Sequence, residues 1–272
     1  MSGEIVSSPL TLPTQFDDRE ALVAHVASIA PWLTPTAPSP HVGGRDAAMS
    51  RLQAIQPRRY GRTRNHLDGA VTRLSPYIRH GILTLSEVRD HAIAHHGDPE
   101  RFEKFIQELA WRDYWQRIYR AHPDRIWSSI EPYKTGWSED DYLLDLPDDI
   151  AHAQTDTACI NDFIRTLQQT GYLHNHARMY LAAYVVHWRR VRWQAGARWM
   201  LNLLLDGDPA SNNLSWQWVA STFSRKPYIF NLTNVRKYCG GTIDTRPETN
   251  RPLDASYGEL SARLFPHRLG GS

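Results

Sequence analysis

The sequence has little cysteine and lacks the short motifs of the commonest nucleotide-binding enzymes. Only two cysteines, Cys159 and Cys239, occur among 272 residues. That number is too small for a disulfide framework or a four-cysteine iron–sulfur cluster, so we expect neither. No GxGxxG or GxxxxGK[ST] loop and no GxSxG turn is present. The sequence therefore does not indicate a Rossmann, P-loop or α/β-hydrolase enzyme.

Long apolar runs and a strong charge of one sign are missing as well. The apolar stretch YLAAYVVHW is too short to cross a bilayer, and no signal peptide is visible. We therefore expect a cytoplasmic protein without a membrane partner. The net charge is only +2, but arginines cluster in PRRYGRTR and WRRVRW. These clusters are either local phosphate-binding patches or solvated helix ends.

Tryptophan, in contrast, is abundant. Ten tryptophans occur in a chain whose 41% hydrophobic and 22% charged residues are ordinary for a globular protein. A tryptophan excess indicates a large aromatic core or surfaces that stack on planar ligands, and both interpretations stay open here.

The hydrophobic periodicity is helical, and alternating strand patterns with tight turns are essentially missing. Helices are predicted from Asp98, as N-cap, to about Pro123 and from Asp156, as N-cap, to Gly171. Three more are predicted from Leu173 to Trp188, from Ala195 to Leu205, and from Asp208-Pro209 onward. We therefore predict an all-α protein.

Proline-rich and polar segments divide the chain into three parts. Residues 1–40 are predicted to form a short helical piece followed by a proline-rich connector, PWLTPTAPSP. Residues 41–241 form the helical body, and residues 242–272 are predicted to be an irregular tail on the surface.

Two helix faces carry chemically unusual sets of side chains. Glu108, Trp111, Arg112 and Trp115 follow helical spacing and share one face. They form either a functional strip or a Glu108–Arg112 ion pair covered by tryptophans. A second face combines an amide, an arginine and a methionine (Asn175, Arg178, Met179) with small residues, which is typical of the wall of a ligand site.

The stretch LLLDGDPASNNLSWQWVAS brings carboxylates, amides and indoles together. Trp216 and Trp218 lie 200° apart on a helix, because each residue turns it by about 100°, so they serve different surfaces. His91 and His95 have the spacing of a metal pair, but no third ligand is near in sequence, so we expect no metal.

Together, GYLHNHARMYLAAYVVHWRRVRWQAG and LLLDGDPASNNLSWQWVAST resemble the FAD-binding helical domain of the photolyase/cryptochrome family. The family patterns N-x-x-R-M, D-G-D-x-A-x-N-N and W-Q-W all occur in register. Upstream, GGRDAAMSRL, YGRTRNHLDGAVTRLSPYIRHGIL and QELAWRDYW resemble further family segments, so the resemblance covers roughly Val42 to Asn231. It implies the helical FAD-binding domain without the family's N-terminal α/β antenna domain, and hence no second antenna chromophore.

The resemblance also implies roles for individual residues. The cofactor FAD would be held by Tyr60, Thr72, Leu74, Ser75, Arg112, Arg178, Asp206, Asp208 and Asn212. Within this set, Arg178 would pair with Asp206, and Asn212 would face the flavin ring. The flipped lesion would contact the catalytic residues Glu108, Trp111, Asn175, Met179 and Trp218. Electrons would reach the flavin through Trp193 and Trp216, and DNA would contact Arg64 and His176.

The activity that the resemblance implies is blue-light-driven splitting of pyrimidine dimers in DNA, single strands included. Two alternatives stay open: a cryptochrome-like photoreceptor without repair activity, and a helical nucleic-acid-binding protein without a cofactor. The sequence also departs from the family pattern. WSEDDYLL lacks the outer tryptophan of the electron relay, for which Trp137, Trp188 or a tyrosine could substitute. His176 and Phe105 stand where arginine and tryptophan are common.

Overall fold

The computed structural model describes residues 13–30 and 39–267. The chain divides into two compact units, Met1–Pro40 and His41–Ser272. The smaller unit contains α1 (Arg19–Ile29), whose first turn is capped by the Asp18 carboxylate through the N–H of Ala21 at 2.7 Å. Among the described helices, none combines the length and the hydropathy that a membrane span requires.

The larger unit is helical, as predicted, and its described residues contain no β-strand beyond one isolated bridge between Leu143 and Val191. Its first half packs around a core cluster that includes Leu52, Leu83 and Phe105. The helices of this half are α2 (Arg45–Gln53), α3 (Pro57–Thr63), α4 (Ser75–Arg79), α5 (Leu85–His96) and α6 (Glu103–Ala121).

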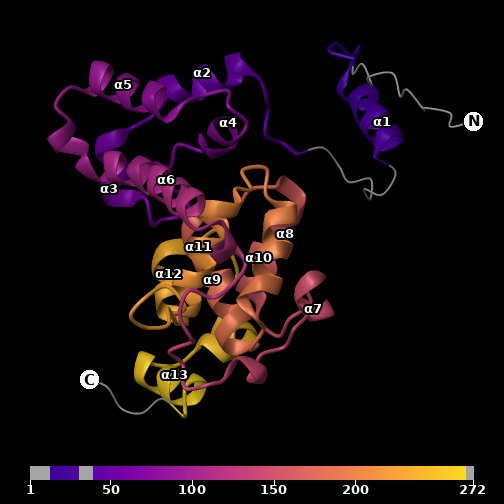
Figure 1. The fold of residues 1–272 in the computed structure, drawn as a ribbon, viewed down its shortest axis with the longest axis vertical. Helices are drawn as coiled ribbons and strands as arrows, with labels where there is room; N and C mark the ends of the chain where they lie inside the picture. Colours follow the sequence, from indigo (N-terminus) through magenta and orange to yellow (C-terminus); the bar gives the residue numbers. More distant parts are fainter. Residues whose placement is uncertain (1–12, 31–38, 268–272) are drawn as a thin grey trace, which may run out of the picture. The chain divides into compact units, whose positions relative to one another are not determined.

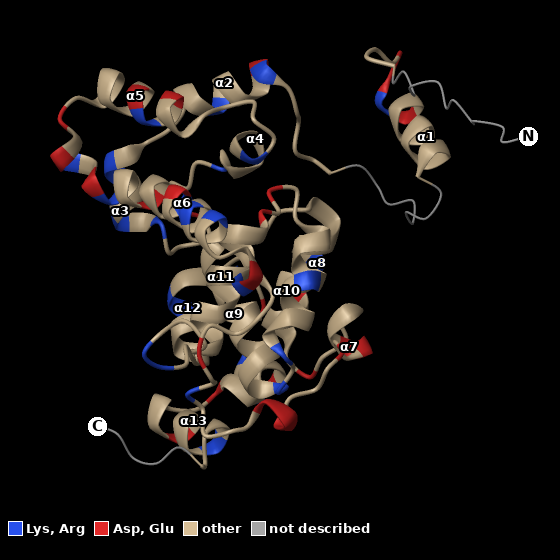
Figure 2. Ribbon diagram, viewed as in Figure 1, with Lys and Arg blue, Asp and Glu red and all other residues tan. Residues whose placement is uncertain are grey.

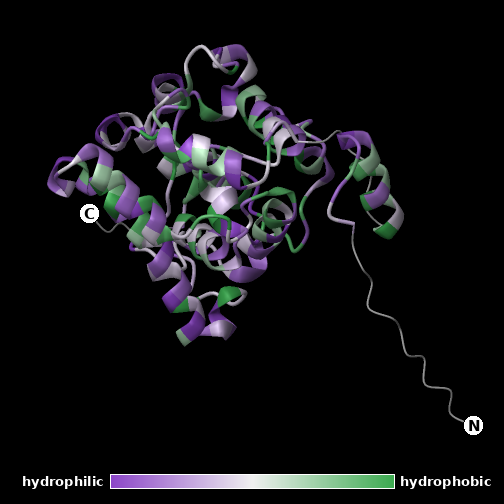
Figure 3. Cartoon of the chain, turned by 90° about the horizontal axis from the view of Figure 1, so that it is seen from above, coloured by the Kyte–Doolittle hydropathy of each residue, from purple (hydrophilic) through white to green (hydrophobic). Residues whose placement is uncertain are grey.

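The second half surrounds a larger core cluster that includes Phe163, Tyr180 and Trp193. Its helices are α7 (Asp148–Ala151), α8 (Ala158–Thr170), α9 (Asn175–Ala183), α10 (Trp193–Leu203), α11 (Pro209–Ala220) and α12 (Leu232–Cys239). Helix α6 packs against α3 and α5 and also against α11, so it joins the two halves (Figure 1). In Figure 3 green and purple alternate along single helices, as expected for helices with one buried and one solvated face.

The helix ends confirm some of the predicted caps and correct others. Asp208 caps α11 through the N–H of Ser211 at 2.8 Å, and Gly171 ends α8 in the left-handed region with φ 66°. The predicted role of Asp156 as N-cap of α8 is wrong, because Thr157 occupies the cap and Asp156 accepts hydrogen bonds from the hydroxyls of Thr157 and Tyr184. Asp98 caps a short 3₁₀ turn, Pro99–Phe102, that precedes α6.

The helix predicted from Leu173 to Trp188 begins later and changes character halfway. Helix α9 begins at Asn175 and passes at Tyr184 into a π-helical turn, Tyr184–Trp188. Four of its five residues are buried, and the Nε2–H of His187 donates a 2.9 Å hydrogen bond to the Val219 carbonyl in α11. Because nearly all residues of this turn are apolar and buried, its sequence pattern does not reveal the change of helix type.

The segment 242–272 was predicted to be irregular, but its described part, residues 242–267, contains regular structure, and residues 268–272 lie outside the described residues. Two 3₁₀ turns, Pro247–Thr249 and Arg251–Leu253, precede the helix α13 (Tyr257–Leu264), which the Ser256–Glu259 capping box starts. The carbonyl of Leu264 accepts a hydrogen bond from Trp137 Nε1 at 2.8 Å. Leu260 is fully buried, so α13 is packed into the structure instead of lying loosely on its surface.

Candidate functional site

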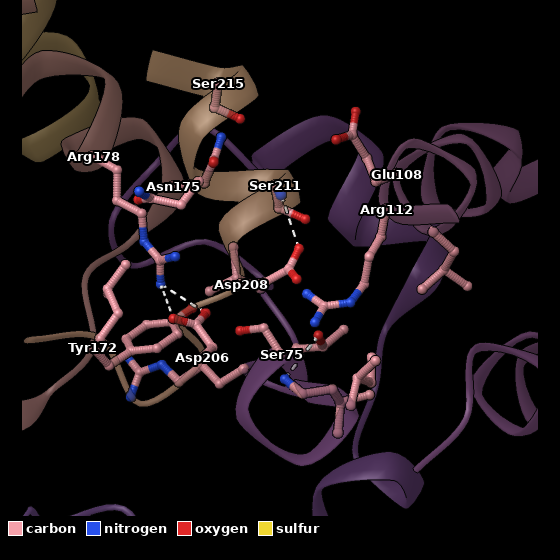
Figure 4. A pocket seen from close by; sticks show the side chains of 18 of the residues that line it. Ser75, Glu108, Arg112, Tyr172, Asn175, Arg178, Asp206, Asp208, Ser211 and Ser215 are labelled. Carbon is pink, nitrogen blue, oxygen red and sulfur yellow. Dashed lines mark hydrogen bonds and ion pairs between the residues drawn. The ribbon is translucent and has the colours of Figure 1, made fainter. Parts of the chain in front are cut away.

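A cavity of about 280 Å³ lies between the two halves of the larger unit. Residues from α3, α4, α5 and α6 line one side and residues from α9, α10 and α11 the other (Figure 4). Thirteen of the eighteen predicted site residues line it: Tyr60, Thr72, Leu74, Ser75, Glu108, Arg112, Asn175, Arg178, Met179, Asp206, Asp208, Asn212 and Trp216. The three tryptophans Trp111, Trp193 and Trp218 do not. The remaining two, Arg64 and His176, lie outside the lining as well.

Arg178 and Asp206 form an ion pair on one wall of the cavity. The guanidinium of Arg178 donates to both carboxylate oxygens of Asp206, at 3.0 and 2.8 Å (Figure 4). Burial would raise the pKa of Asp206, but the charge and hydrogen bonds of Arg178, together with Ser75, hold it below its usual value. The pair that the resemblance implies is therefore present as a charged, directional contact.

The turn between Asp206 and Asp208 is tight enough to require glycine. A Cβ on Gly207 would lie 2.8 Å from the carbonyl oxygen of Leu201, closer than real Cβ contacts allow. The side chain of Arg79 at the end of α4 donates to the Gly207 carbonyl at 2.5 Å. This turn therefore directs two carboxylates into one cavity and is held in place from the opposite half of the unit.

Asp208 connects α6 and α11. Its Oδ2 caps α11 through Ser211 N–H, and its Oδ1 accepts a 2.7 Å hydrogen bond from Gln116 Nε2 of α6. Helix α11 itself contains no charged residue and is tan throughout in Figure 2, so the negative charge at its N-terminus comes from Asp208. Gln116 was not predicted from the sequence, because its partner lies 92 residues away.

Arg112 supplies a cation that has no direct anionic partner. Its side chain points into the cavity from α6 toward Asp208 (Figure 4), yet it makes no ion pair or hydrogen bond with another described residue. Burial lowers the pKa of Arg112, and Asp208 and Asp206 oppose that effect from a distance. The Oγ of Ser211, also on the cavity wall, is buried without a hydrogen-bond partner. A polar, anionic ligand would satisfy both groups.

Residues 72–75 line the same cavity. Thr72 Oγ1 accepts a hydrogen bond from the Leu74 N–H at 3.3 Å, and Arg73 between them adopts φ 53°, a left-handed conformation. Burial raises the pKa of the nearby Tyr60 to about 12, so its phenol stays protonated and can donate. Arg73 itself lines the cavity and was not predicted from the sequence, which gives no signal for a left-handed arginine.

Tyr172 is a second residue of the cavity lining that was not predicted from the sequence. Its ring lies 5.4 Å from the Arg178 guanidinium and 6.0 Å from that of Arg73. Burial raises the pKa of this phenol as well. Tyr172 directly follows Gly171, the glycine that ends α8, and this position is the feature of the sequence from which it could have been predicted.

Glu108, Asn175 and Met179 line the cavity together, although they come from α6 and α9. Asn175 Nδ2 lies 3.8 Å from Met179 Sδ. Glu108 is paired with Arg64 at 3.1 Å and with Lys104 at 3.0 Å. The alternative of a Glu108–Arg112 ion pair is therefore wrong: the carboxylate contacts Lys104 in the preceding helical turn and Arg64, the residue after α3.

The two indoles that the resemblance assigns to the lesion lie outside the cavity wall. Trp111 is 47% exposed and its ring packs 5.2 Å from that of Trp115. Trp218 is 41% exposed and its ring lies 5.7 Å from that of Tyr228. Both are therefore accessible to a planar ligand at the surface.

Trp216, two residues before Trp218, is buried and faces the cavity, which confirms that the two indoles serve different surfaces. Trp193 is also fully buried; its Nε1 donates to Ser129 Oγ at 3.0 Å. The backbone N–H of Trp193 donates to the Tyr133 hydroxyl at 3.2 Å, and the Tyr133 ring stacks on Tyr142 at 4.2 Å. A tyrosine as the outer relay member stays a prediction.

His176 and Arg64, which were predicted to contact DNA, are not two free cations. His176 lies between the rings of Tyr180 and Tyr238, and burial lowers its pKa to about 4, so it is neutral at pH 7. Arg64 is paired with Glu108. His91 and His95 stack at 4.0 Å, and no group of three or more metal-binding side chains occurs among residues 13–30 and 39–267.

Residues 105–242 match the family model described as the FAD-binding domain of DNA photolyase. The deoxyribodipyrimidine photo-lyase of Streptomyces griseus is 36% identical over 157 residues, which cover 56% of this chain and 32% of that protein. The deoxyribodipyrimidine photo-lyase of Synechococcus is 27% identical over 266 residues, covering 85% and 52%. The chain thus spans about half, or less, of the length of these relatives.

Solved structures show the same fold. A bacterial class III photolyase from Agrobacterium tumefaciens superposes with a TM-score of 0.63 at 22% identity, covering 94% of this chain and 52% of that one. A cryptochrome from Synechocystis gives a TM-score of 0.63 at 20% identity, covering 86% and 51%. Since the family model matches half of its residues, the chain belongs to the photolyase/cryptochrome family, of which it contains the helical FAD-binding domain.

Proposed function

We propose that the cavity binds FAD and that the chain uses it, under blue light, to split pyrimidine dimers in DNA. One observation carries the proposal. Glu108, Asn175 and Met179 line the same cavity as the Arg178–Asp206 pair and Asp208. In the proposal, the flavin and a pyrimidine base would therefore bind side by side. Relatives named deoxyribodipyrimidine photo-lyase support this activity.

The residues on the cavity wall fit FAD chemically. The cofactor carries a negatively charged diphosphate and a ring with hydrogen-bond donors and acceptors along its edge. Arg112, which has no ion-pair partner, could bind the negatively charged diphosphate. The Ser211 hydroxyl, which has no hydrogen-bond partner, could donate to a polar group of the cofactor. No glycine-rich loop is needed, because the hydroxyls of Tyr60, Thr72 and Ser75 already face the cavity.

In this proposal Tyr60, Thr72, Leu74, Ser75 and Arg112 hold the diphosphate. The flavin ring is held by Arg178, Asp206, Asp208 and Asn212. When bound and reduced, FAD excited by blue light would lend the dimer one electron and recover it once the ring has opened, so that the reaction is redox-neutral overall. The chain itself orients cofactor and substrate and excludes water from the space between them. We propose residues 41–241 as the domain that performs this binding.

Glu108 and Asn175 would hold the lesion by hydrogen bonds, since a pyrimidine presents both N–H donors and C=O acceptors. Glu108 would then exchange its contacts with Arg64 and Lys104 for the base, leaving these cations for the adjacent phosphates. Trp111 and Trp218, both half exposed, would stack on the lesion. Trp216 and Trp193, both buried, would supply electrons to the oxidised flavin.

The proposal is tested with purified, reduced protein and an oligonucleotide that carries one cyclobutane thymine dimer, illuminated with blue light or kept dark. Light-dependent loss of the dimer is the expected result. We expect Glu108→Ala to lower the repair rate about tenfold or more while the flavin absorbance per protein stays unchanged. Glu103→Ala removes a carboxylate from the same helix at an exposed position and serves as the control.

The remaining outcomes identify which part of the proposal fails. A colourless protein that takes up no FAD contradicts the cofactor assignment. A yellow protein that leaves the dimer intact in blue light contradicts repair and points to a photoreceptor. Equal repair by Glu108→Ala and wild type contradicts the role of Glu108.

A separate variant tests the electron supply. Trp216→Phe is expected to abolish reduction of the oxidised flavin by light, because phenylalanine is much harder to oxidise than tryptophan, while the chemically reduced variant still repairs. The absorbance of the oxidised flavin during illumination is the measurement. Normal photoreduction in Trp216→Phe would show that electrons arrive by another route.

A further inference from the structure

A second hollow opens on the surface of the larger unit, between the end of the π-helical turn Tyr184–Trp188 and the end of α13. We call it the Trp137 hollow. Its volume of about 550 Å³ falls within the range of roughly 300–1,000 Å³ that small-molecule sites occupy. None of its lining residues lines the cavity between the two halves. Trp137 and Trp188 are candidates for the outer relay position, but the other lining residues have no part in the proposed function.

The wall of the hollow is mostly apolar. Five of the eight described residues that line it are Trp137, Trp188, Pro252, Leu264 and Pro266. Trp137 Nε1 donates to the Leu264 carbonyl at 2.8 Å, and Trp188 Nε1 donates to the Pro252 carbonyl at 2.9 Å. Because these hydrogen bonds fix both indoles, the hollow is preformed, and the apolar wall suits the apolar body of a ligand.

Two arginines give the hollow a positive charge. Arg190 and Arg263 are exposed, and neither side chain forms an ion pair with another described residue. The guanidinium of Arg190 lies over the ring of Trp137, 4.5 Å from its centroid. Arg263 donates to the Pro252 carbonyl, which leaves most of its N–H groups free. No aspartate or glutamate occurs among the described residues that line the hollow.

The carboxylates near these arginines are held by other partners. Asp141 accepts 2.7 Å hydrogen bonds from both the N–H and the hydroxyl of Ser138. Glu259 belongs to the capping box that starts α13. The charge of Arg190 acts on Asp141, and that of Arg263 on Glu259, without an ion pair. Both guanidiniums are therefore available to an external anion.

The backbone of Arg190 is strained. Its φ of 45° lies in the left-handed region, which residues other than glycine seldom adopt. The Arg190 carbonyl accepts a 2.7 Å hydrogen bond from the N–H of Leu143, and the Leu143 carbonyl accepts one from the N–H of Arg192 at 2.9 Å. These contacts hold the strained residue in place. Because strained residues cluster at ligand sites, this conformation is a second observation that points to a ligand.

A buried acceptor on the hollow lacks a partner. His187 lines the hollow and is 3% exposed. Since its Nε2–H donates to the Val219 carbonyl, its Nδ1 is an acceptor, and this atom has no hydrogen-bond partner. Buried polar atoms without partners are rare in folded proteins. A donor on a bound ligand would satisfy Nδ1.

We propose that the Trp137 hollow binds a small aromatic carboxylate, with its ring against the two indoles and its carboxylate on Arg190 and Arg263. Guanidinium groups bind carboxylates through paired hydrogen bonds and also stack on planar rings. An aromatic body is favoured over an aliphatic one, because two indoles and a stacked guanidinium line the hollow. A ring N–H of the ligand donates to His187 Nδ1. The inference goes beyond the proposed function and does not depend on it.

The test uses indole-3-acetate, which combines an aromatic ring, an N–H donor and a carboxylate. The full chain is titrated by calorimetry in the dark, in an excess of FAD, which competes for the cavity between the two halves. We expect Arg190→Gln combined with Arg263→Gln to weaken binding about tenfold or more, because both charged partners of the carboxylate are lost. Indole-3-ethanol, which lacks the carboxylate, should bind wild type about tenfold more weakly and should not distinguish the variant from wild type.

Arg101→Gln combined with Arg120→Gln is the control, because it removes the same charge from exposed positions outside the hollow. It should leave the affinity within about twofold. Pro266 is exposed at the rim, so Pro266→Glu and Pro266→Gln form a second matched pair that does not disturb the core. We expect the glutamate variant to bind indole-3-acetate about threefold more weakly than the glutamine variant, since only the glutamate repels the carboxylate.

The outcomes separate the parts of the proposal. A dissociation constant above about 1 mM for indole-3-acetate, or equal affinity of wild type and the double arginine variant, overturns the site. Tighter binding of decanoate than of indole-3-acetate overturns the aromatic assignment. Equal affinity for 1-naphthaleneacetate, which has no N–H, overturns the contact with His187. A chain that repairs no dimer but binds indole-3-acetate through Arg190 and Arg263 contradicts only the proposed function.

Discussion

Gly196 allows α10 to approach the indole of Trp216 more closely than any other residue type would. A Cβ at this position would lie 2.4 Å from Cη2 and Cζ3 of Trp216 and 3.1 Å from Cγ1 of Val185. Trp216 is 2% exposed and packed in the core, so its ring could yield only toward the cavity. We expect Gly196→Ala to lower the free energy of unfolding by about 2 kcal/mol and to reduce the bound FAD.

Gly258→Ala is the matched control, because its Cβ would meet only Ser256 Oγ at 3.9 Å in the exposed first turn of α13. This change should be neutral or stabilise by up to about 1 kcal/mol, through helix propensity alone. Urea unfolding and the flavin absorbance per protein measure both effects. A Gly196→Ala variant with wild-type stability and flavin content would show that the indole has room to move.

The Arg178–Asp206 ion pair should make the stability of the chain depend on pH. Asp206→Asn leaves the Arg178 guanidinium without its anion, so the apoprotein should lose about 3 kcal/mol of unfolding free energy at pH 7. Because Arg178 holds the pKa of Asp206 below that of the unfolded chain, the stabilisation is present above the unfolded pKa and disappears as the pH falls through the folded one.

Urea unfolding of wild type and Asp206→Asn between pH 7 and pH 3 measures this effect. The difference between their free energies of unfolding should become smaller as the pH approaches 3. Asp254→Asn, at an exposed position, should show almost no difference at any pH. A constant difference between wild type and Asp206→Asn would contradict a charged pair.

At the scale of elements, His187 joins the π-helical turn to α11 through the Val219 carbonyl. Burial lowers the pKa of His187 to about 4, so the folded chain keeps this ring neutral while the unfolded chain takes up a proton near pH 6.5. For this depressed pKa the stabilisation is therefore fully present above pH 6.5 and is lost as the pH falls from 6.5 toward 4.

His187→Gln keeps a donor for the Val219 carbonyl but cannot titrate. Between pH 8 and pH 5 we expect wild type to lose about 2 kcal/mol more unfolding free energy than the variant, since the unfolded histidine gains a proton over 1.5 pH units. Parallel pH profiles of the two proteins would refute a neutral, buried His187.

The sequence predicts elements well where one residue's backbone preference decides, and poorly where packing decides. Asp208-Pro209 and Gly171 give the ends of α11 and α8 correctly, because a capping carboxylate and a left-handed glycine act locally. The π-helical turn after α9 and the burial of α13 depend on contacts with distant segments. The capping box at Ser256 was nonetheless visible in the sequence and marks the start of α13.

At the scale of the whole molecule, the sequence predicts the members of the site better than their contacts. Tyr60, Glu108, Arg178 and Asp208 all line one cavity, as the motifs imply. The partners of Glu108, however, are Arg64 and Lys104 rather than Arg112. The ion-pair partners of a side chain depend on which helices pack against its own. Those helices can be far apart in sequence, so a local sequence pattern does not predict the partners.

The division of the chain into two units gives a final prediction. All the described residues that line the cavity belong to His41–Ser272, and the family model begins only at residue 105. A chain without residues 1–40 should therefore bind FAD as tightly as the full chain. FAD at 100 times its dissociation constant should stabilise both forms by about 2.7 kcal/mol, since it binds only the folded state. Flavin titration and thermal unfolding with and without FAD measure this, and Asp206→Asn in both forms is the control for binding in the cavity. A truncated chain that folds but binds FAD more weakly would show that residues 1–40 contribute to the site, and the domain would then have to begin before residue 41.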